Sequence, residues 1–442
     1  MSSAVEQFAL LASSVLLAVL YRCAQFLRIL FKINSLRQFE GRGPGDELSA
    51  WRLPPLPAGT SQEMLFFCSS AGEYEQALPL VQKLSDDGKI SALFLFLSRS
   101  GLDFFRARRE PGRAALAPVD TTWNWRRFAH HHPVRASVVI RHEWWPAFLH
   151  VMGSTGPLFL VDAGMPAGNP GSRWKNAGRG YLAKKFSAVF TVDDASREFF
   201  IHQYGLPQER VITTGDTKFD RVLDRTSSVP PRKLRDDILA LAAGRSILVC
   251  GSVYDEDVQL IFEAFAAEPG LRHNWFVVLV PHHVGRGATA RFAAIANQHR
   301  LSGAPGIAST GQPADFTTVD VMGSLAELYA LSSAAWVGGA CHNKVHNVLE
   351  PAAWSAWLAC GPRLHNSREA VLMHDAGILR AIDRAGDLGK WLAGVTAASP
   401  GGDGKDPRTK AFIESHAGAS QRIARFIGQT LFEGAAKLET PR

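Results

Sequence analysis

Short apolar runs separated by amphipathic stretches are the feature of this chain that most restricts its fold. The runs MLFFCSS, SALFLFLS, SVVIRH, PLFLVDA and SAVFTVD follow one another between residues 64 and 193. The residues from Glu73 to Leu84, after the first run, are predicted to form a helix. Apolar runs of about four to eight residues that alternate with helices are typical of a parallel, doubly wound sheet.

The same pattern occurs a second time. It weakens over residues 222–244, where Pro230 and Pro231 interrupt it, and restarts with SILVCGS, WFVVLVP, AAWVGG and WLACGP. A chain of 442 residues is long enough for two cores. We therefore expect an α/β protein with two Rossmann-like doubly wound domains, at residues 38–222 and 223–410. Residues 411–442 are expected to add a C-terminal helix, from Phe412 to Leu438.

The N-terminal segment is apolar enough to associate with a membrane. Residues 8–21 carry no charge, and the apolar character continues to residue 31. As a helix, residues 8–31 would be ~36 Å long, enough to cross a hydrocarbon core of ~30 Å. Basic residues follow the run rather than precede it, which favours an anchor with a cytoplasmic C-terminal side over a cleaved signal peptide. Residues 1–37 are predicted to be this anchor, either spanning or interfacial, with an ordinary buried helix as the alternative.

Charge and cysteine content narrow the class of protein only a little. The formal net charge of +7 suits an anionic partner, such as a nucleic acid, a nucleotide-linked donor or an anionic membrane, and equally suits a mildly basic soluble surface. The five cysteines form no CxxC pair, which argues against a disulfide scaffold or a structural zinc site. A hydrophobic fraction of 46% excludes wholesale disorder.

Ligands of doubly wound sheets bind beyond the carboxyl ends of the strands, so the residues there are the candidates for chemistry. After the first strand, Ser70 and Gly72 leave room for close backbone approach. Glu73 could remove a proton from a hydroxyl nucleophile, or could only cap the helix. After the third strand, Glu143 and Trp145 could hold a sugar, although tryptophans at such a position are also common in cores.

Later strand ends carry candidates for anion binding. Lys218 could meet a phosphate or a carboxylate, or be solvated beside Asp220. Ser252 lies in a small turn before a predicted helix and is a candidate phosphate cradle. His282 and His283 follow another strand, but no third ligand has a recognisable metal-site spacing, so no metal site is expected.

The segment after the diglycine Gly338-Gly339 is the richest in polar side chains. It contains His346, Asn347 and Glu350. At a helix start, Asn347 and Glu350 would share a face, and a glutamate there could accept hydrogen bonds from both hydroxyls of a ribose. The chain has no GxGxxG and no Walker motif, which argues against simple dinucleotide or kinase chemistry.

With these segments in this order, the chain resembles the bacterial transferases of 3-deoxy-D-manno-octulosonic acid (Kdo), which use a CMP-linked donor. The family's motifs S-V-G-E, E-L-W-P, G-N-L-K-F-D, P-R-H-P, D-T-M-G-E-L and G-G…H-N-x-L-E-P-A have counterparts at residues 70–73, 143–146, 215–220, 281–284, 320–325 and 338–352. The resemblance runs from residue 1 to about residue 365.

The resemblance implies a GT-B fold, with two domains facing a cleft, and an inverting transfer that needs neither metal nor cofactor. It implies that Kdo or a related sugar acid passes from a CMP-sugar to a lipid A-type or other envelope glycolipid. It places Glu73 as the base. The expected acceptor residues are Ser70, Gly72, Glu143 and Trp145. The expected donor residues are Lys218, Ser252, His282, Met322, Gly323, Ser324, His346, Asn347 and Glu350. The partners would include the membrane, at the cytoplasmic face of the bacterial inner membrane, and no nucleic acid.

The departures from the family pattern keep two alternatives open. His282 stands where the family has arginine, and Ser324 stands where it has glutamate. Arg286 lies near His282 in the sequence and could replace the lost charge. One alternative is a GT-B enzyme that uses another nucleotide sugar in surface polysaccharide synthesis. The other is a catalytically degenerate paralogue that acts as a binding protein.

Overall fold

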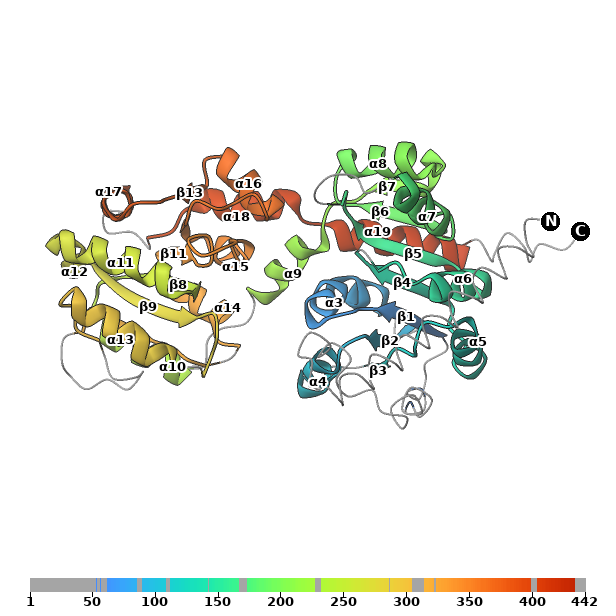
Figure 1. Cartoon of the computed structure of the whole chain (residues 1–442), viewed down its shortest axis with the longest axis horizontal. Helices are drawn as coiled ribbons and strands as arrows, with labels where there is room; N and C mark the ends of the chain where they lie inside the picture. The colour runs from blue at the N-terminus through green and yellow to red at the C-terminus, as the bar shows by residue number, and fades with distance from the viewer. Residues whose placement is uncertain are drawn as a thin grey trace, which may run out of the picture. The chain divides into compact units, whose positions relative to one another are not determined.

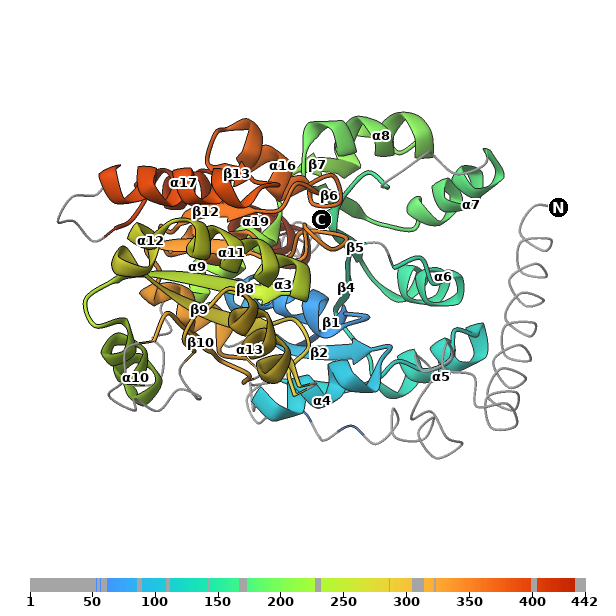
Figure 2. The same cartoon turned by 60° about the vertical axis from the view of Figure 1, so that its left-hand side comes forward.

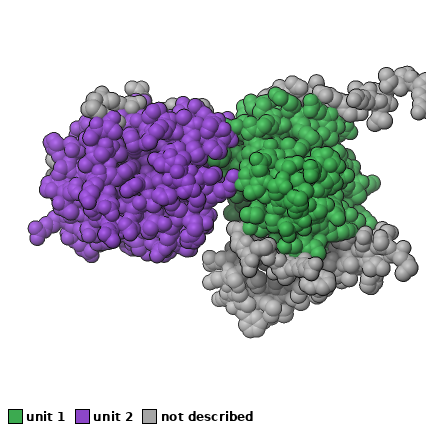
Figure 3. Space-filling model, turned by 90° about the horizontal axis from the view of Figure 1, so that it is seen from above, with its two compact units in different colours: residues 1–221, 417–442 green, residues 222–416 purple. Residues whose placement is uncertain are grey.

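The computed structural model describes residues 53, 56, 62–85, 90–108, 112–141, 143–166, 173–226, 232–285, 287–303, 314–321, 323–398 and 404–433. The predicted anchor, Met322 and Arg286 lie outside the described residues. Within the described part of the chain, no helix combines the length and the apolarity needed to cross a membrane. The chain divides into two compact units, Met1–Arg221 with Ala417–Arg442 and Val222–His416, which are coloured separately in Figure 3.

Unit 1 is built on a seven-stranded parallel sheet with the order β3-β2-β1-β4-β5-β6-β7. Its strands are β1 (Gln62–Phe67), β2 (Ile90–Phe96), β3 (Arg113–Leu116), β4 (Ala136–Ile140), β5 (Leu158–Ala163), β6 (Ala188–Thr191) and β7 (Val211–Thr213). Its helices are α3 (Ala71–Ser85), α4 (Arg99–Arg108), α5 (Thr122–His131), α6 (Pro146–Thr155), α7 (Arg173–Ala183), α8 (Asp194–Tyr204) and α19 (Ala419–Gly428), with the short turns η2 (Gln208–Arg210) and η4 (Gln429–Glu433).

Successive side chains of β1 point to opposite faces of this sheet and pack into two separate cores. Met64 and Phe66 pack on the face that α3, α4 and α19 cover. Leu65 and Phe67 pack on the opposite face, against α5, α6, α7 and α8 (Figures 1 and 2). Because both faces are buried, the strand is a continuous apolar run in the sequence.

Unit 2 is a six-stranded parallel sheet with the order β10-β9-β8-β11-β12-β13. Its strands are β8 (Ser246–Val253), β9 (Trp275–Pro281), β10 (Phe316–Thr318), β11 (Ala334–Val337), β12 (Trp357–Cys360) and β13 (Leu379–Ala381). Its helices are α10 (Arg232–Ala242), α11 (Asp255–Ala267), α12 (Pro269–Asn274), α13 (Ala288–Gln298), α14 (Leu325–Leu328), α15 (Leu349–Ala353), α16 (Arg368–Asp375), α17 (Ala385–Ala398) and α18 (Pro407–His416), with η3 (Tyr329–Leu331) after α14. Its main core lies between the sheet and α11, α13 and α17.

The predicted fold class, two parallel doubly wound α/β sheets, is confirmed. Each predicted apolar run forms a strand, and the predicted helix at Glu73–Leu84 is α3. Sequence reasoning missed β3, β7, β10 and β13, which have four, three, three and three residues and lie at sheet edges, where short strands carry little periodic signal.

The predicted single C-terminal helix is wrong. The chain instead forms α18 and α19, separated at Gly418, whose φ is +92°. A left-handed residue cannot continue an α-helix, and glycine adopts that conformation readily. The break also marks a change of unit, because α18 belongs to unit 2 and α19 to unit 1.

Candidate active site

Both sheets have a point where the strand order reverses, between β1 and β4 in unit 1 and between β8 and β11 in unit 2. Ligands of open α/β sheets bind beyond the carboxyl ends of the strands at this reversal. The segments there are residues 69–73, 141 and 143–145 in unit 1, and residues 252–254 and 338–346 in unit 2. Each unit therefore has one region in which the predicted residues converge.

Glu73 is the central acid of the region in unit 1. It lies in the first turn of α3, and its Oε2 accepts hydrogen bonds from the Ser69 backbone N–H at 2.5 Å and the Ser69 hydroxyl at 2.6 Å. Burial raises the pKa of Glu73, the nearby Glu143 raises it further, and the bonds from Ser69 and the charge of Arg141 oppose the rise. A carboxylate with a raised pKa is better matched to taking a proton near neutral pH.

The neighbouring acceptor candidates differ in their exposure. Ser70 and Gly72 are exposed, and the Ser70 hydroxyl accepts the Glu73 N–H at 3.4 Å. A Cβ on Gly72 would meet only the Ser70 Oγ, at 3.8 Å, so no close contact requires glycine there.

The two tryptophans after β4 have separate roles. The Trp145 indole N–H donates to Glu143 Oε2 at 2.6 Å, which fixes this predicted acceptor pair next to Glu73. Trp144 instead packs against Phe186, Phe200 and Tyr204. The aromatic residue that remains near the predicted acceptor carboxylates is therefore Trp145.

Asp162, at the end of β5, is a buried acid that sequence reasoning did not assign to the site. It has a φ of +55°, accepts the Thr217 N–H at 2.9 Å and accepts a hydrogen bond from the Thr217 hydroxyl. Burial raises the pKa of Asp162, and the neighbouring Asp216 raises it further. Its signal in the sequence is an acid at the end of the apolar run PLFLVDA. Asp162 holds the start of α9 (Thr217–Arg225) against the sheet.

Lys218 belongs to unit 1, whereas the other described donor candidates belong to unit 2. Its backbone N–H donates to Asp216 Oδ1 at 2.9 Å, and Asp216 Oδ2 lies 3.5 Å from an Arg141 guanidinium nitrogen. This places Lys218 beside the segment that follows β4.

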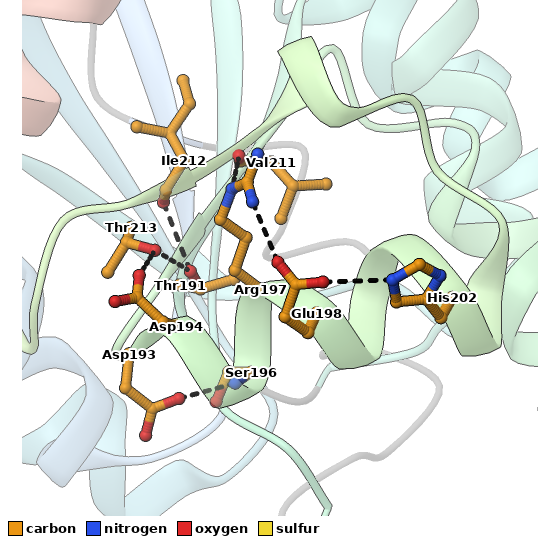
Figure 4. A network of polar contacts seen from close by, with 10 residues as sticks. All are labelled: Thr191, Asp193, Asp194, Ser196, Arg197, Glu198, His202, Val211, Ile212 and Thr213. Carbon is orange, nitrogen blue, oxygen red and sulfur yellow. Dashed lines mark hydrogen bonds and ion pairs between the residues drawn. The ribbon is translucent and has the colours of Figure 1, made fainter.

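The strand ends at the other side of this sheet are occupied by internal polar contacts (Figure 4). Asp193 accepts the Ser196 N–H at 2.6 Å and so caps α8, and Asp194 accepts the Thr213 hydroxyl at 2.7 Å. Arg197 donates to the Val211 carbonyl at 3.1 Å. These groups stabilise the packing of α8 on β7, so we place no ligand there.

In unit 2, Asp257 joins the two segments at the reversal. This buried carboxylate accepts the backbone N–H groups of Tyr254 at 3.0 Å and Gly339 at 2.9 Å, and the Trp336 indole N–H at 3.2 Å. Close packing continues at Gly338, where a Cβ would lie 2.4 Å from the Ser252 carbonyl oxygen. Gly338 therefore serves backbone contact with the β8 turn, whereas Gly339, with a φ of +93°, lies against the Lys344 carbonyl and the His346 ring.

Four nearly parallel rings contact one another beside this turn, in the order His342, Tyr254, His282 and His346, and the series is bent, because Tyr254 and His346 are themselves 5.9 Å apart. The successive centroid distances are 4.5, 4.7 and 4.3 Å, with interplanar angles of 19°, 29° and 18°. We refer to these residues as the ring column. Sequence reasoning assigned His282 and His346 to the donor site but missed Tyr254 and His342.

Two histidines of the ring column, His282 and His346, favour their neutral form. Burial lowers the pKa of His346 to about 4, and His282, Lys344 and His283 add to the effect. The pKa of His282 is also lowered, first by burial and then by His283, Lys344 and His342. Among the described residues, no group of three or more His, Cys, Asp or Glu side chains is arranged to hold a metal ion.

The remaining donor candidates are only partly as predicted. Glu350 lies in the first turn of α15 and accepts a hydrogen bond from Arg225 at 3.1 Å. The prediction that Asn347 and Glu350 share a helical face is wrong, because α15 begins at Leu349 and the Asn347 side chain accepts the Leu349 N–H at 3.1 Å. Ser324 is buried and its hydroxyl donates to the Val321 carbonyl, whereas Gly323 is exposed.

Residues 48–221 match the sequence model of the family described as 3-deoxy-D-manno-octulosonic-acid transferase (kdotransferase). The chain is 28% identical over 238 residues to a protein of that name from Chlamydophila psittaci, a match that covers 51% of this chain and 52% of the relative. It is 25% identical over 299 residues to the transferase of the same name from Aquifex aeolicus, covering 67% of this chain and 75% of that one.

Among solved structures, a putative UDP-N-acetylglucosamine 2-epimerase from Listeria monocytogenes has a TM-score of 0.60 and 14% identity, over 85% of this chain and 98% of that protein. At this identity, the similarity concerns the GT-B-like fold alone.

Proposed function

Because residues 48–221 match the 3-deoxy-D-manno-octulosonic-acid transferase family and the chain is similar to transferases of that name, we propose that it is a member of this family and moves Kdo, or a related sugar acid, from a CMP-linked donor to an envelope glycolipid of the lipid A type. The observation that carries the proposal is Glu73 at the carboxyl end of β1. It is partly buried, has a raised pKa, and lies in the part of the chain that matches the family.

In the proposed reaction, Glu73 takes the proton of an acceptor hydroxyl. At the same time, the oxygen of that hydroxyl forms a bond to the anomeric carbon of the donor sugar. The bond from that carbon to CMP breaks, and CMP leaves with the bonding electrons. Attack on the face opposite CMP inverts the anomeric carbon. Glu143 and Trp145, close to Glu73, would orient the acceptor sugar.

The donor is assigned to unit 2. The turn after β8 and the Gly338-Gly339 loop bring backbone groups and the ring column together at the strand reversal. Glu350, held by Arg225, is the acid we assign to the ribose hydroxyls.

The experiment that tests the function combines binding and transfer. In a thermal-shift series, CMP should stabilise the protein more than UDP, GDP or ADP at equal concentration. Incubation with CMP-Kdo and a lipid A precursor should give a product heavier by one Kdo residue or more, detected by mass spectrometry. Greater stabilisation by UDP would indicate another nucleotide sugar, and nucleotide binding without any transfer would indicate a binding protein.

We also propose that residues 1–37 anchor the protein at the cytoplasmic face of the inner membrane. The support is the apolar run at residues 8–31 and the basic residues that follow its charge-free part. A chain that begins at residue 38 should remain in the supernatant after ultracentrifugation and unfold cooperatively. If it pellets with membranes as the full chain does, another surface holds the protein there.

A further inference from the structure

The ring column is assembled from three separate segments of unit 2. Tyr254 precedes α11, His282 follows β9, and His342 and His346 lie in the loop after β11. Their rings are within 29° of parallel at each successive contact. His283 packs edge-on against His282, with centroids 4.5 Å apart. The column therefore concentrates three stacked imidazoles at the strand reversal, where a ligand of this fold binds.

The described carboxylates around the column already have partners. From α11, Glu256 lies 2.9 Å from His342 Nδ1, and Asp257 accepts the backbone N–H groups of Tyr254 and Gly339. From the loop after β10, Asp320 accepts the Gly285 N–H at 2.8 Å. Glu256 therefore contacts His342, and Asp257 binds the backbone beside the column.

The other end of the column faces cationic or neutral groups. Lys344 and His283 both act on His282 and His346. His346 Nε2 is buried without a hydrogen-bond partner among the described residues. The positive charge of Lys344 beside the rings of His282 and His346 favours an oxyanion there.

We propose that the ring column is the anion-recognising element of the donor site, and that binding of the donor's phosphate draws one proton from solvent onto His282 or His346. This inference rests on the proposed function. An oxyanion at hydrogen-bond distance favours the imidazolium form and offsets the repulsion from Lys344 and His283. The aromatic face of Tyr254, 4.7 Å from His282, stabilises the new cation.

Proton uptake gives the donor site a pH dependence that a fixed guanidinium would not have. Burial and nearby positive charge lower the pKa of His282 and His346, so a proton that phosphate binding places on either ring is taken up from solvent. Affinity then rises as the pH falls, by up to about tenfold per pH unit for one proton taken up. In the related motif, arginine stands at the position of His282 and carries its charge at every physiological pH.

The test is isothermal titration calorimetry on the full chain in detergent at pH 7.5, in buffers of different ionisation enthalpy. CMP should bind with net proton uptake, and cytidine, which lacks the phosphate, should bind weakly and without uptake. Ionisation of the CMP phosphate itself contributes equally to the proton uptake measured for every variant. This contribution therefore cancels when the uptake of two variants is compared.

Three variants and one control test whether the proton uptake belongs to the ring column or to other groups. His282→Asn and His346→Asn should each reduce both the uptake and the affinity for CMP. His282→Arg should retain the affinity and abolish the uptake, because its charge is already present. His273→Asn, on α12, is the matched control and should behave like the unaltered protein.

The outcomes also distinguish this inference from the proposed function. CMP binding without proton uptake, or uptake that both asparagine variants leave unchanged, would overturn the role of the column and leave the donor assignment standing. Binding of UDP in place of CMP, with the same uptake and the same variant effects, would support the column and overturn the donor assignment.

Discussion

At the scale of single residues, two side chains with opposite pKa shifts mark the candidate regions of the two units. The carboxyl of Glu73 has a raised pKa, and the imidazole of His346 has a lowered one. In both cases burial is the largest cause, because it disfavours whichever form carries the charge. The same physical effect therefore prepares a base in unit 1 and a neutral ring in unit 2.

Glu73→Gln should lower the turnover number about 10²–10⁴-fold, which is the usual contribution of a general base. Glutamine keeps the shape and can still accept from Ser69, but it cannot take a proton. CMP affinity should barely change, whereas Glu350→Ala should weaken CMP binding with a smaller effect on the rate with bound donor. Steady-state rates with CMP-Kdo and calorimetry with CMP provide the measurement.

The control for this substitution is Glu198→Gln, an exposed glutamate of α8 that contacts Arg197 and His202. It should leave turnover unchanged. If the Glu73→Gln protein turned over at nearly the original rate, the base would have to be another group, and Glu143 would be the next candidate.

His346 predicts a pH dependence of stability. Its pKa is about 4 in the folded protein, against 6.5 as the ordinary value, so the unfolded chain binds more protons between these two values. The stability contributed by the neutral ring is present above about pH 6.5 and is lost as the pH falls towards 4. Thermal unfolding of unit 2 at a series of pH values should show this loss.

His346→Asn should reduce the slope of unfolding temperature against pH in that window, and His273→Asn should not. An unchanged slope in the His346 variant would assign the pH dependence to other groups.

At the scale of elements, the segment from Gly215 to Asp220 holds secondary structure together. Asp216 accepts the Lys218 N–H, Thr217 is held by Asp162, and Asp220 accepts the N–H groups of Gly418 and Ser420. Asp220 thus caps the first turn of α19 from another helix. Asp220, the last residue of the segment 215–220, therefore has a structural role.

Asp220→Ala should therefore lower the free energy of unfolding by about 1 kcal/mol, within the 0.5–2 kcal/mol range of lost helix caps. Urea unfolding should show a lower midpoint with an unchanged slope. Asp103→Ala, which removes only exposed pairs to Arg99 and Arg106, should change the midpoint little. Equal effects from the two substitutions would contradict the capping role.

At the scale of the whole molecule, the chain passes from unit 1 to unit 2 within α9 and returns after α18. The returning segment contributes Ile423, Ala424, Ile427 and Leu431 to the core shared with α3. Unit 1 is therefore incomplete until the C-terminal residues have been synthesised. Folding of this unit depends on contacts between the two ends of the described sequence.

Truncation after His416 should unfold unit 1, although it removes no residue of its sheet. Replacing one buried isoleucine or leucine by alanine costs about 2–5 kcal/mol, and losing three such side chains approaches the 5–15 kcal/mol stability of a typical domain. Limited proteolysis should degrade residues 62–221 of the truncated chain and spare residues 222–416. In a second protein, residues 417–433 are joined directly to residue 221 through a flexible linker, in place of residues 222–416. Residues 62–221 of this protein should again resist proteolysis.

Local sequence was sufficient to predict the two α/β halves and several site residues. The apolar runs of β1, β4, β8 and β9 are uninterrupted because both faces of these strands are buried. Strand ends could be located from those runs, and a parallel sheet brings such ends to one edge. Glu73, Glu143, His282 and His346 were found in this way, and each lies where the strand-end rule puts it.

Only the tertiary structure decided which distant residues act together. Asp257 and Gly339 are 82 positions apart, and Asp220 and Gly418 are 198 positions apart. No periodicity relates them, so neither the ring column partners of His282 nor the cap of α19 could be derived from the sequence. Buried polar groups must find a partner wherever the folded chain offers one. Which partner is available depends on strand order and helix packing, and those are set by burial of the whole core rather than by neighbours along the chain.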